Sequence, residues 1–241
     1  MSKTSAGLCA SLAVLALIFS AGVSAQQGQF QPGVHFTVIE NARPSDSDTV
    51  SVVEAFSYMC THCATFEPYI ANWVTRKPDN VVFTRIPVVF GRGSWELYAR
   101  AYTTAEVMGI AEEAHQALMD AIWKEQKVYR TIEELGQFYS AYGVQPQAFV
   151  ATSKSFAVDA KLRKDQRTVQ EAGVRGTPSL IVNGMYLVAG NAAVGSYDVM
   201  LDVVNYLVAQ ETRPVADDAE PAPEVVEQSV EVLEAEVADE S

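Results

Sequence analysis

The spacing of apolar and polar residues divides the chain into strand-like and helix-like stretches. The stretch from Thr49 to Tyr58 is rich in Val and Phe, which is typical of a central strand buried on both faces. From Cys63 to Trp73 the apolar residues recur at helical spacing, and β character returns from Val81 to Phe90. These three stretches predict a β-α-β unit.

Helical patterns replace the β signal between about residues 91 and 173. Four or so helices, judged from typical helix lengths, predict a helical subdomain inserted into the α/β unit. Its segments are expected at 95–108, 112–127, 132–142 and from 148 onward. The β signal then resumes over Ser179–Asn183, and Asn183-Gly184 predicts a hairpin turn into a second strand over 185–189. An edge strand is expected over 35–40 and a last helix over 197–209.

The first 25 residues have the composition of a secretory signal. Lys3 is their only charge, an apolar run extends from Leu8 to Phe19, and Val23-Ser24-Ala25 offers small residues for cleavage. An uncleaved membrane anchor is the alternative, because residues 6–25 carry no charge. The strongly apolar part is shorter than a membrane span, which favours a cleaved signal over 1–25.

Acidic residues are concentrated at the other end of the chain. The net charge is −13, and residues 214–241 supply ten of the negative charges with no Lys or Arg. The remaining −3 over residues 1–213 argues against a nucleic-acid partner. Residues 214–241 are rich in Ala, Val, Pro and Glu, a composition that predicts a disordered tail. A helix with Val226, Val230, Leu233 and Val237 on one face is the alternative.

Loss of the signal would remove Cys9 and leave only Cys60 and Cys63 in the mature chain. No other thiol then remains to form a structural cross-link, so the pair is expected to be used chemically. A zinc site is the alternative, but structural zinc usually has four Cys or His ligands. The mature chain offers two Cys and three scattered His, of which His35 and His115 lie in ordinary strand and helix patterns.

The Cys60-Thr61-His62-Cys63 motif lies where the predicted strand ends and the predicted helix begins. At the positive end of a helix dipole, among unpaired backbone N–H groups, Cys60 is favoured as a thiolate. The two-residue spacer places Cys63 one turn away, close enough for a reversible disulfide. A helix dipole contributes only about 0.3–1 kcal/mol, so further donors are needed, and His62 is the candidate.

Glu54 falls on an otherwise apolar face of the predicted strand. Burial of a carboxylate there costs free energy unless a partner or a chemical role accounts for it. Glu54 is either a proton acceptor with a raised pKa beneath the cysteine pair or the partner of a cation on the next strand, for which Arg85 is the candidate. The two roles can coexist. Thr177-Pro178 precedes a later strand, and the pattern alone does not predict a cis bond there.

These motifs resemble those of a known family. Residues 53–63 (VEAFSYMCTHC), Thr84-Arg85 and residues 174–184 (VRGTPSLIVNG) are similar, in order and spacing, to the DsbA family of periplasmic disulfide oxidases. The resemblance covers residues 34–209 approximately. It implies an α/β, thioredoxin-like fold with an inserted helical subdomain at about 91–173, forming one domain over 26–213.

The resemblance also implies the roles of individual residues. Cys60 would be the nucleophilic cysteine, Cys63 its partner and His62 the residue that tunes the pair. Glu54 would be the buried acid, and Pro178 a cis-proline facing the disulfide.

The implied function is donation of the Cys60–Cys63 disulfide to reduced exported polypeptides in the periplasm. Reoxidation would come from a DsbB-like membrane protein. No cofactor or metal beyond the disulfide is expected, and the protein is expected to act as a monomer.

Two positions depart from the family pattern. The family most often has Pro where this chain has Thr61 and Val where it has Thr177, and Thr before the cis-proline occurs in isomerase relatives. Oxidising strength and the match to a DsbB-like partner depend on these positions.

A disulfide isomerase or reductase of the DsbC and DsbG kind is one alternative function. Only about eight residues separate the predicted signal from the first strand, which is too few for the dimerisation module of those proteins. A thiol-based metal carrier or a chaperone is the alternative from another class.

Overall fold

The computed structural model describes residues 29–40, 42 and 48–212. The predicted signal (1–25) and the acidic tail (214–241) lie outside the described residues. The elements, in chain order, are β1 (Thr37–Val38), β2 (Val50–Phe56), α1 (Thr61–Val74), β3 (Val81–Pro87), α2 (Gly93–Val107), α3 (Ala111–Trp123), α4 (Ile132–Tyr139), the short 3-10 helix η1 (Ser140–Tyr142), α5 (Pro146–Ser153), α6 (Phe156–Glu171), β4 (Ser179–Val182), β5 (Tyr186–Ala189) and α7 (Tyr197–Glu211).

The strands form one sheet in the order β1-β5-β4-β2-β3. β2 and β3 run parallel because α1 crosses over between them, whereas β2 pairs antiparallel with β4. The expected β-α-β unit is confirmed. The register sets Glu54 beside Arg85, which brings the two charged positions of neighbouring strands together.

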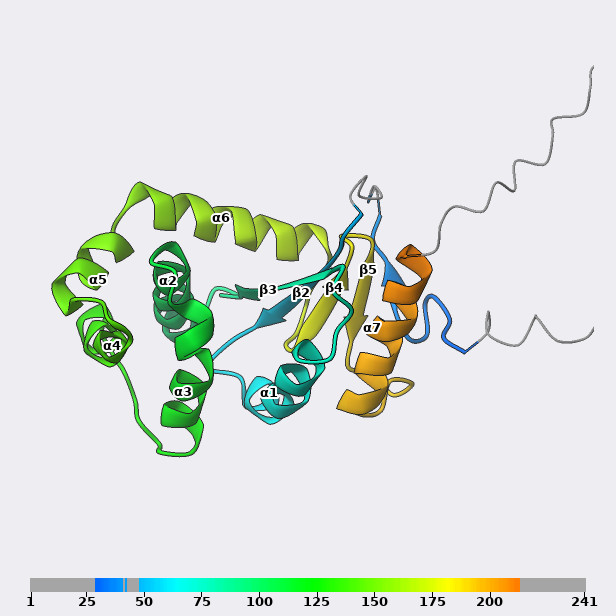
Figure 1. Cartoon of the computed structure of the whole chain (residues 1–241), viewed down its shortest axis with the longest axis horizontal. Coiled ribbons are helices and arrows are strands. Elements are labelled where there is room, and N and C mark those ends of the chain that lie inside the picture. The colour runs from blue at the N-terminus through cyan, green and yellow to red at the C-terminus, as the bar shows by residue number, and fades with distance from the viewer. Residues whose placement is uncertain (1–28, 41, 43–47, 213–241) are drawn as a thin grey trace, which may run out of the picture.

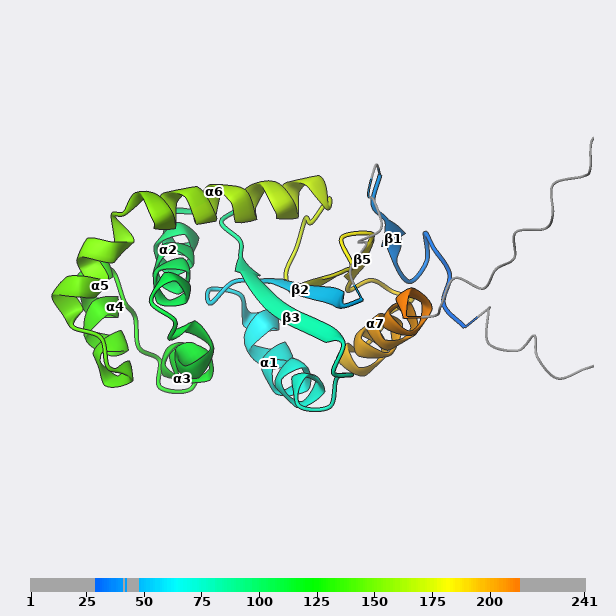
Figure 2. The ribbon, with the colours of Figure 1, turned by 45° about the horizontal axis from the view of Figure 1, so that its top comes forward.

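Helices cover both faces of the sheet. α1 and α7 lie on one side and α6 on the other (Figure 1), and Figure 2 shows the same three layers from a second direction. One core packs α1 and α7 against the sheet through residues such as Phe66, Ile70 and Leu207. A smaller core places Val169 of α6 against Ile181 of β4. The sheet is therefore buried on both faces.

The segment between β3 and β4 is helical throughout its regular structure, and α2 to α5 lie at one end of the sheet (Figure 1). Its core is continuous with the end of β2, because Phe56, Tyr58 and Cys63 are buried in the same cluster as residues of α2, α3 and α4. The cysteine motif thus lies where the sheet meets the helical region.

The helical region differs from expectation at one point. The segment expected from residue 148 onward consists of two helices, α5 and α6. The Ser155 side chain accepts a hydrogen bond from the Val158 backbone N–H and starts α6 separately. Within the part of the chain that the structure describes, no helix has the length and apolar character needed to cross a membrane.

Candidate redox site

Cys60 occupies the N-cap of α1, in extended backbone geometry, and Cys63 lies in the first turn. Both are free thiols in this structure. Cys63 is buried at 1% exposure, whereas Cys60 is partly exposed. An incoming reactant can therefore reach Cys60 and not Cys63, which agrees with the order of roles that the sequence predicts.

The surroundings of Cys60 stabilise its anion. A hydrogen bond from the Cys63 thiol has the largest effect and, against the opposing effect of burial, the pKa of Cys60 falls from 9.0 to about 5. Thr177 and the backbone N–H groups of Cys63 and His62 add to this effect. At neutral pH, Cys60 is therefore a thiolate whenever the pair is reduced.

Cys63 has the opposite character. Burial raises the pKa of its thiol far above the ordinary value, and the hydrogen bond to Cys60 and the charge of Glu54 raise it further. The reduced pair therefore carries one proton and one negative charge, with the proton on Cys63. The two sulfurs therefore differ in role: Cys60 is the sulfur that a substrate can attack, and Cys63 is the sulfur that leaves when the disulfide opens.

His62 acts on Cys60 through its backbone. Its side chain is exposed, and only its backbone N–H is among the groups that lower the pKa of Cys60. Its carbonyl accepts a hydrogen bond of 3.1 Å from the Tyr197 hydroxyl of α7. The structure therefore places His62 beside the cysteine pair without assigning its imidazole to the thiolate.

The segment before β4 faces the cysteine pair. The Thr177–Pro178 peptide bond is cis, as the family resemblance implies. The Cys60 sulfur lies 3.4 Å from the Thr177 carbonyl oxygen, to which it donates a hydrogen bond only while the thiol is protonated. The Thr177 hydroxyl is buried and has no other hydrogen bond among the described residues, so it is free to donate to the thiolate.

A buried ionic network lies beneath the motif. Arg85 Nε is 3.0 Å from Glu54 Oε2, and Arg85 Nη2 is 3.2 Å from Glu67 Oε1. The third nitrogen of Arg85 binds Glu112, whose side chain is largely exposed. The ion pair expected between Glu54 and Arg85 is confirmed, and one guanidinium serves three carboxylates.

Both interior carboxyls of this network are hard to ionise. Burial raises the pKa of Glu54 and of Glu67 to about 7 in each case, although the nearby Arg85 opposes the change. Glu54 also acts electrostatically on Cys63. The two roles that the sequence left open for Glu54 therefore coexist in the structure: an ion pair and a carboxyl with a raised pKa near the cysteines.

Glu67 and Glu112 were not among the predicted site residues, and His115 was expected only as part of an ordinary helix pattern. His115 lies between Tyr58 and Glu67 and hydrogen bonds to both. A signal for Glu67 was present, because it occupies the buried face of α1 together with Phe66 and Ile70. A carboxylate at such a position requires a buried partner.

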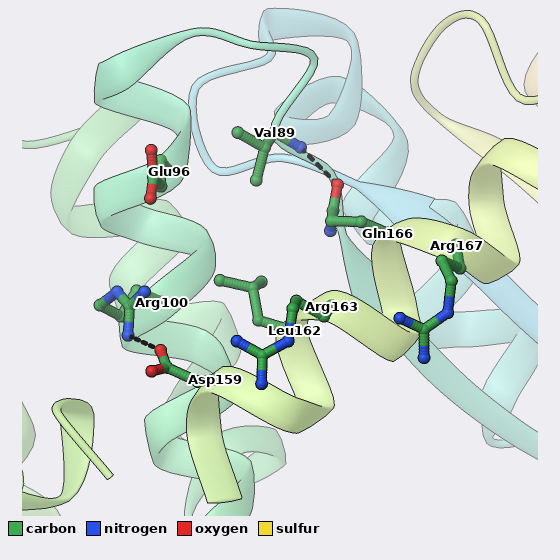
Figure 3. A pocket seen from close by; sticks show the side chains of 8 residues that line it. All are labelled: Val89, Glu96, Arg100, Asp159, Leu162, Arg163, Gln166 and Arg167. Atoms are coloured by element: carbon green, nitrogen blue, oxygen red, sulfur yellow. Dashed lines mark hydrogen bonds and ion pairs between the residues drawn. The ribbon is translucent and has the colours of Figure 1, made fainter. Parts of the chain in front are cut away.

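A separate pocket of about 430 Å³ lies between α2 and α6. Figure 3 shows its wall, where Arg100 bonds Asp159 and the Gln166 side chain accepts a hydrogen bond from the Val89 backbone. Gln166 also donates to the Pro87 carbonyl, so its amide joins α6 to the end of β3. None of the predicted site residues lines this pocket.

Comparison with known proteins identifies relatives of the whole domain. The model of the DSBA-like thioredoxin domain family matches residues 51–201. Thiol:disulfide interchange protein DsbA of Pseudomonas aeruginosa is 34% identical over 200 residues, covering 83% of this chain and 94% of the relative. The protein of the same name from Azotobacter vinelandii is 36% identical over 162 residues, 67% of this chain and 75% of the relative.

Solved structures give the same result. Oxidoreductase DsbA from Xylella fastidiosa superposes with a TM-score of 0.69 at 36% identity, covering 73% of this chain and 95% of the other. Pseudomonas aeruginosa DsbA superposes with a TM-score of 0.68 at 32% identity, covering 76% of this chain and 94% of the other. The matched region contains the cysteine motif, the helical segment and the cis-proline.

Proposed function

Because the chain belongs to the family of DSBA-like thioredoxin domains, we propose that it donates a disulfide held between Cys60 and Cys63 to reduced exported polypeptides. The chain is a thiol:disulfide oxidoreductase, like the relatives it matches. The observation that carries the residue assignment is the position of the partly exposed Cys60 at the N-cap of α1 beside the buried Cys63, an arrangement that lowers the pKa of Cys60 to about 5.

The reaction follows from this asymmetry. A substrate thiolate attacks Cys60, the Cys60–Cys63 bond breaks, and Cys63 takes the electron pair and then a proton. A second substrate thiolate attacks the substrate sulfur of the mixed disulfide, and Cys60 leaves as a thiolate. The substrate is oxidised by two electrons and the enzyme is reduced by two. A leaving group with a low pKa makes the last step fast.

The remaining assignments of the proposal follow the family. The disulfide itself accepts the two electrons, so the reaction needs no cofactor or metal. Reoxidation is assigned to a DsbB-like membrane protein, the site of action to the periplasm and the acting form to a monomer. The predicted signal over 1–25 supports the periplasmic assignment.

Equilibration with glutathione buffers tests the proposal, with free thiols counted by alkylation and mass. A Cys60 pKa about two units below pH 7 favours the reduced form by at most ~3 kcal/mol, or ~60 mV, which solvent screening at the partly exposed sulfur reduces to roughly 1–2 kcal/mol. We expect a potential well above the roughly −300 mV of structural disulfides. Cys63→Ser should accumulate a mixed disulfide with oxidised glutathione, because its Cys60 thiolate attacks the glutathione disulfide, releases one glutathione thiolate and has no second enzyme thiol to displace the other, and Cys60→Ser should not. A pair that stays oxidised throughout the glutathione range, or an active Cys60→Ser variant, contradicts the proposal.

A further inference from the structure

His115 lies at the centre of a buried polar cluster that joins α3 to α1 and to the segment before Cys60. Its side chain is 2% exposed. One ring nitrogen, Nδ1, is 2.9 Å from the Tyr58 hydroxyl, and the other, Nε2, is 3.1 Å from Glu67 Oε2. Both nitrogens therefore have a partner, and neither partner is on the helix that carries His115.

The surroundings keep this imidazole neutral. Aromatic rings of Phe56 and Tyr102 pack against it at centroid distances of 5.0 and 5.9 Å. Burial and the charge of Arg85 lower the pKa of His115 well below 6.5, and Glu112 opposes them. A neutral imidazole has one N–H and one acceptor nitrogen, so it can donate to only one of its two partners at a time.

The protonation state of Glu67 decides which nitrogen carries the hydrogen. An ionised Glu67 can only accept, so Nε2 donates to it and Nδ1 accepts from the Tyr58 hydroxyl. A protonated Glu67 donates to Nε2, so Nδ1 carries the hydrogen and donates to Tyr58. In both states every hydrogen bond of His115 is retained, and only its direction changes.

The second state requires another acceptor for the Tyr58 hydroxyl hydrogen. The hydroxyl of Tyr139 on α4 is the candidate, because it is buried without a hydrogen-bond partner among the described residues and interacts electrostatically with Tyr58. After the reversal we therefore expect the Tyr58 hydroxyl to donate to Tyr139.

We propose that His115 is a positioning residue for the thiol-disulfide reaction, one that reverses its tautomer when Glu67 gains or loses a proton and so keeps the Glu67 carboxyl hydrogen-bonded in both charge states. This rests on the proposed function. Glu54 acts electrostatically on Cys63, the charge of Glu67 in turn raises the pKa of Glu54, and Arg85 binds both carboxylates. A change of charge at the cysteine pair therefore reaches Glu67, and His115 accommodates it without leaving a buried group unpaired.

Nitrogen-15 NMR of the histidine rings tests the tautomer directly in the full-length reduced protein between pH 5.5 and 8.5. We expect the Nδ1–H tautomer of His115 at low pH and the Nε2–H tautomer at high pH, with a midpoint near 7, the pKa of Glu67. In Glu67→Gln, the tautomer should no longer change with pH. A single tautomer throughout in the native protein, or an imidazolium that titrates as an ordinary histidine, overturns the proposal.

The pH profile of peptide oxidation tests the functional consequence. In His115→Phe, Glu67 loses a hydrogen-bond donor to its carboxylate, so an inflection near pH 7 should move upward by about one unit. His35→Phe, at a partly exposed histidine whose Nδ1 accepts from the Gln31 backbone N–H, is the control and should keep the native profile. An unchanged profile in a folded His115→Phe variant also overturns the proposal. If the tautomer reverses but the glutathione potential is that of a structural disulfide, only the proposed function fails.

Discussion

At the scale of single residues, hydrogen-bond donors distinguish the two sulfurs. Cys60 receives the Cys63 thiol, two backbone N–H groups and the Thr177 side chain, whereas Cys63 is surrounded by apolar groups and the charge of Glu54. A thiolate stabilised by several donors is both a good target within the disulfide and a good leaving group. Each donor is therefore a separate control on oxidising strength.

Thr177→Val should raise the pKa of Cys60. The substitution keeps the side-chain shape approximately but removes the hydroxyl, and one hydrogen bond to a charged group corresponds to about one pKa unit. The thiolate absorbance near 240 nm, followed against pH in the reduced protein, measures the change. Thr65→Val is the control, because the Thr65 hydroxyl is committed to the Thr61 carbonyl. A Cys60 titration that is identical in native protein and Thr177→Val contradicts this assignment.

The sequence could predict the cysteine roles because they depend on local geometry: a helix begins at the motif. It could not predict that the Thr177 side chain is a donor to Cys60. Thr177 is 117 positions from Cys60 in the chain, and only the fold brings them together. The helix start predicts backbone N–H donors around Cys60, and the His62 backbone N–H is one of them.

At the scale of secondary-structure elements, Arg85 of β3 is the common partner of carboxylates from β2, α1 and α3. Removal of one buried partner leaves uncompensated charge, which is far more costly than loss of a surface ion pair. The network therefore fixes α1, and with it the cysteine motif, against the sheet and the helical region.

Arg85→Met should destabilise the fold by roughly 3–5 kcal/mol at pH 8 and by less at pH 5. The folded pKa of Glu54 and of Glu67, about 7, is above the ordinary 4.5, so these groups stabilise the fold fully below 4.5 and that stability is lost as pH rises through 7. Without Arg85 both pKa values rise further, and the loss deepens at high pH. Urea unfolding at the two pH values measures this difference.

The matched control is Arg100→Met. Arg100 pairs with Asp159 at 2.7 Å, but the two side chains are 29% and 40% exposed, so the cost should be about 1 kcal/mol or less from the ion pair. Equal losses at pH 5 and pH 8 in Arg85→Met would contradict the assignment of charged carboxylates to the network.

Helices and strands with a strong local pattern could be predicted from the sequence, whereas the buried side chains that they contact in the fold could not. The positions of β2, α1 and β3 follow from apolar spacing, and the turn at Asn183-Gly184 from its residue types. The division between α5 and α6 depends on one capping serine, Ser155, within a continuous helical pattern. Glu67 and His115 carry the spacing of buried helix faces, but which buried groups they meet depends on the packing of α1 against α3.

At the scale of the whole molecule, the cysteine pair links the redox state to the stability of the fold. The sheet core and the helical core meet at the motif, since Cys63 is buried with residues of the helical region while α1 packs on the sheet. Unfolding removes the donors around Cys60 and returns its thiol to an ordinary pKa. Stabilisation of the thiolate in the folded state therefore adds to the free energy of unfolding of the reduced protein.

The reduced protein should gain stability relative to the oxidised protein as pH rises from 5 to 9. The folded pKa of Cys60 is about 5 and the ordinary value is 9.0, so the thiolate's contribution is fully present above 9 and is lost as pH falls through 5. The two-unit gap between pH 7 and the folded pKa corresponds to at most ~3 kcal/mol, which solvent screening at the partly exposed sulfur reduces to roughly 1–2 kcal/mol. Urea unfolding of both redox forms across this range measures the difference.

The buried carboxyls titrate in both redox forms, so their contributions largely cancel in the difference. Cys60→Ser cannot form the anion and should gain no stability relative to the oxidised native protein as pH rises. A difference between the redox forms that is flat with pH would mean that the protein fold does not stabilise the Cys60 anion.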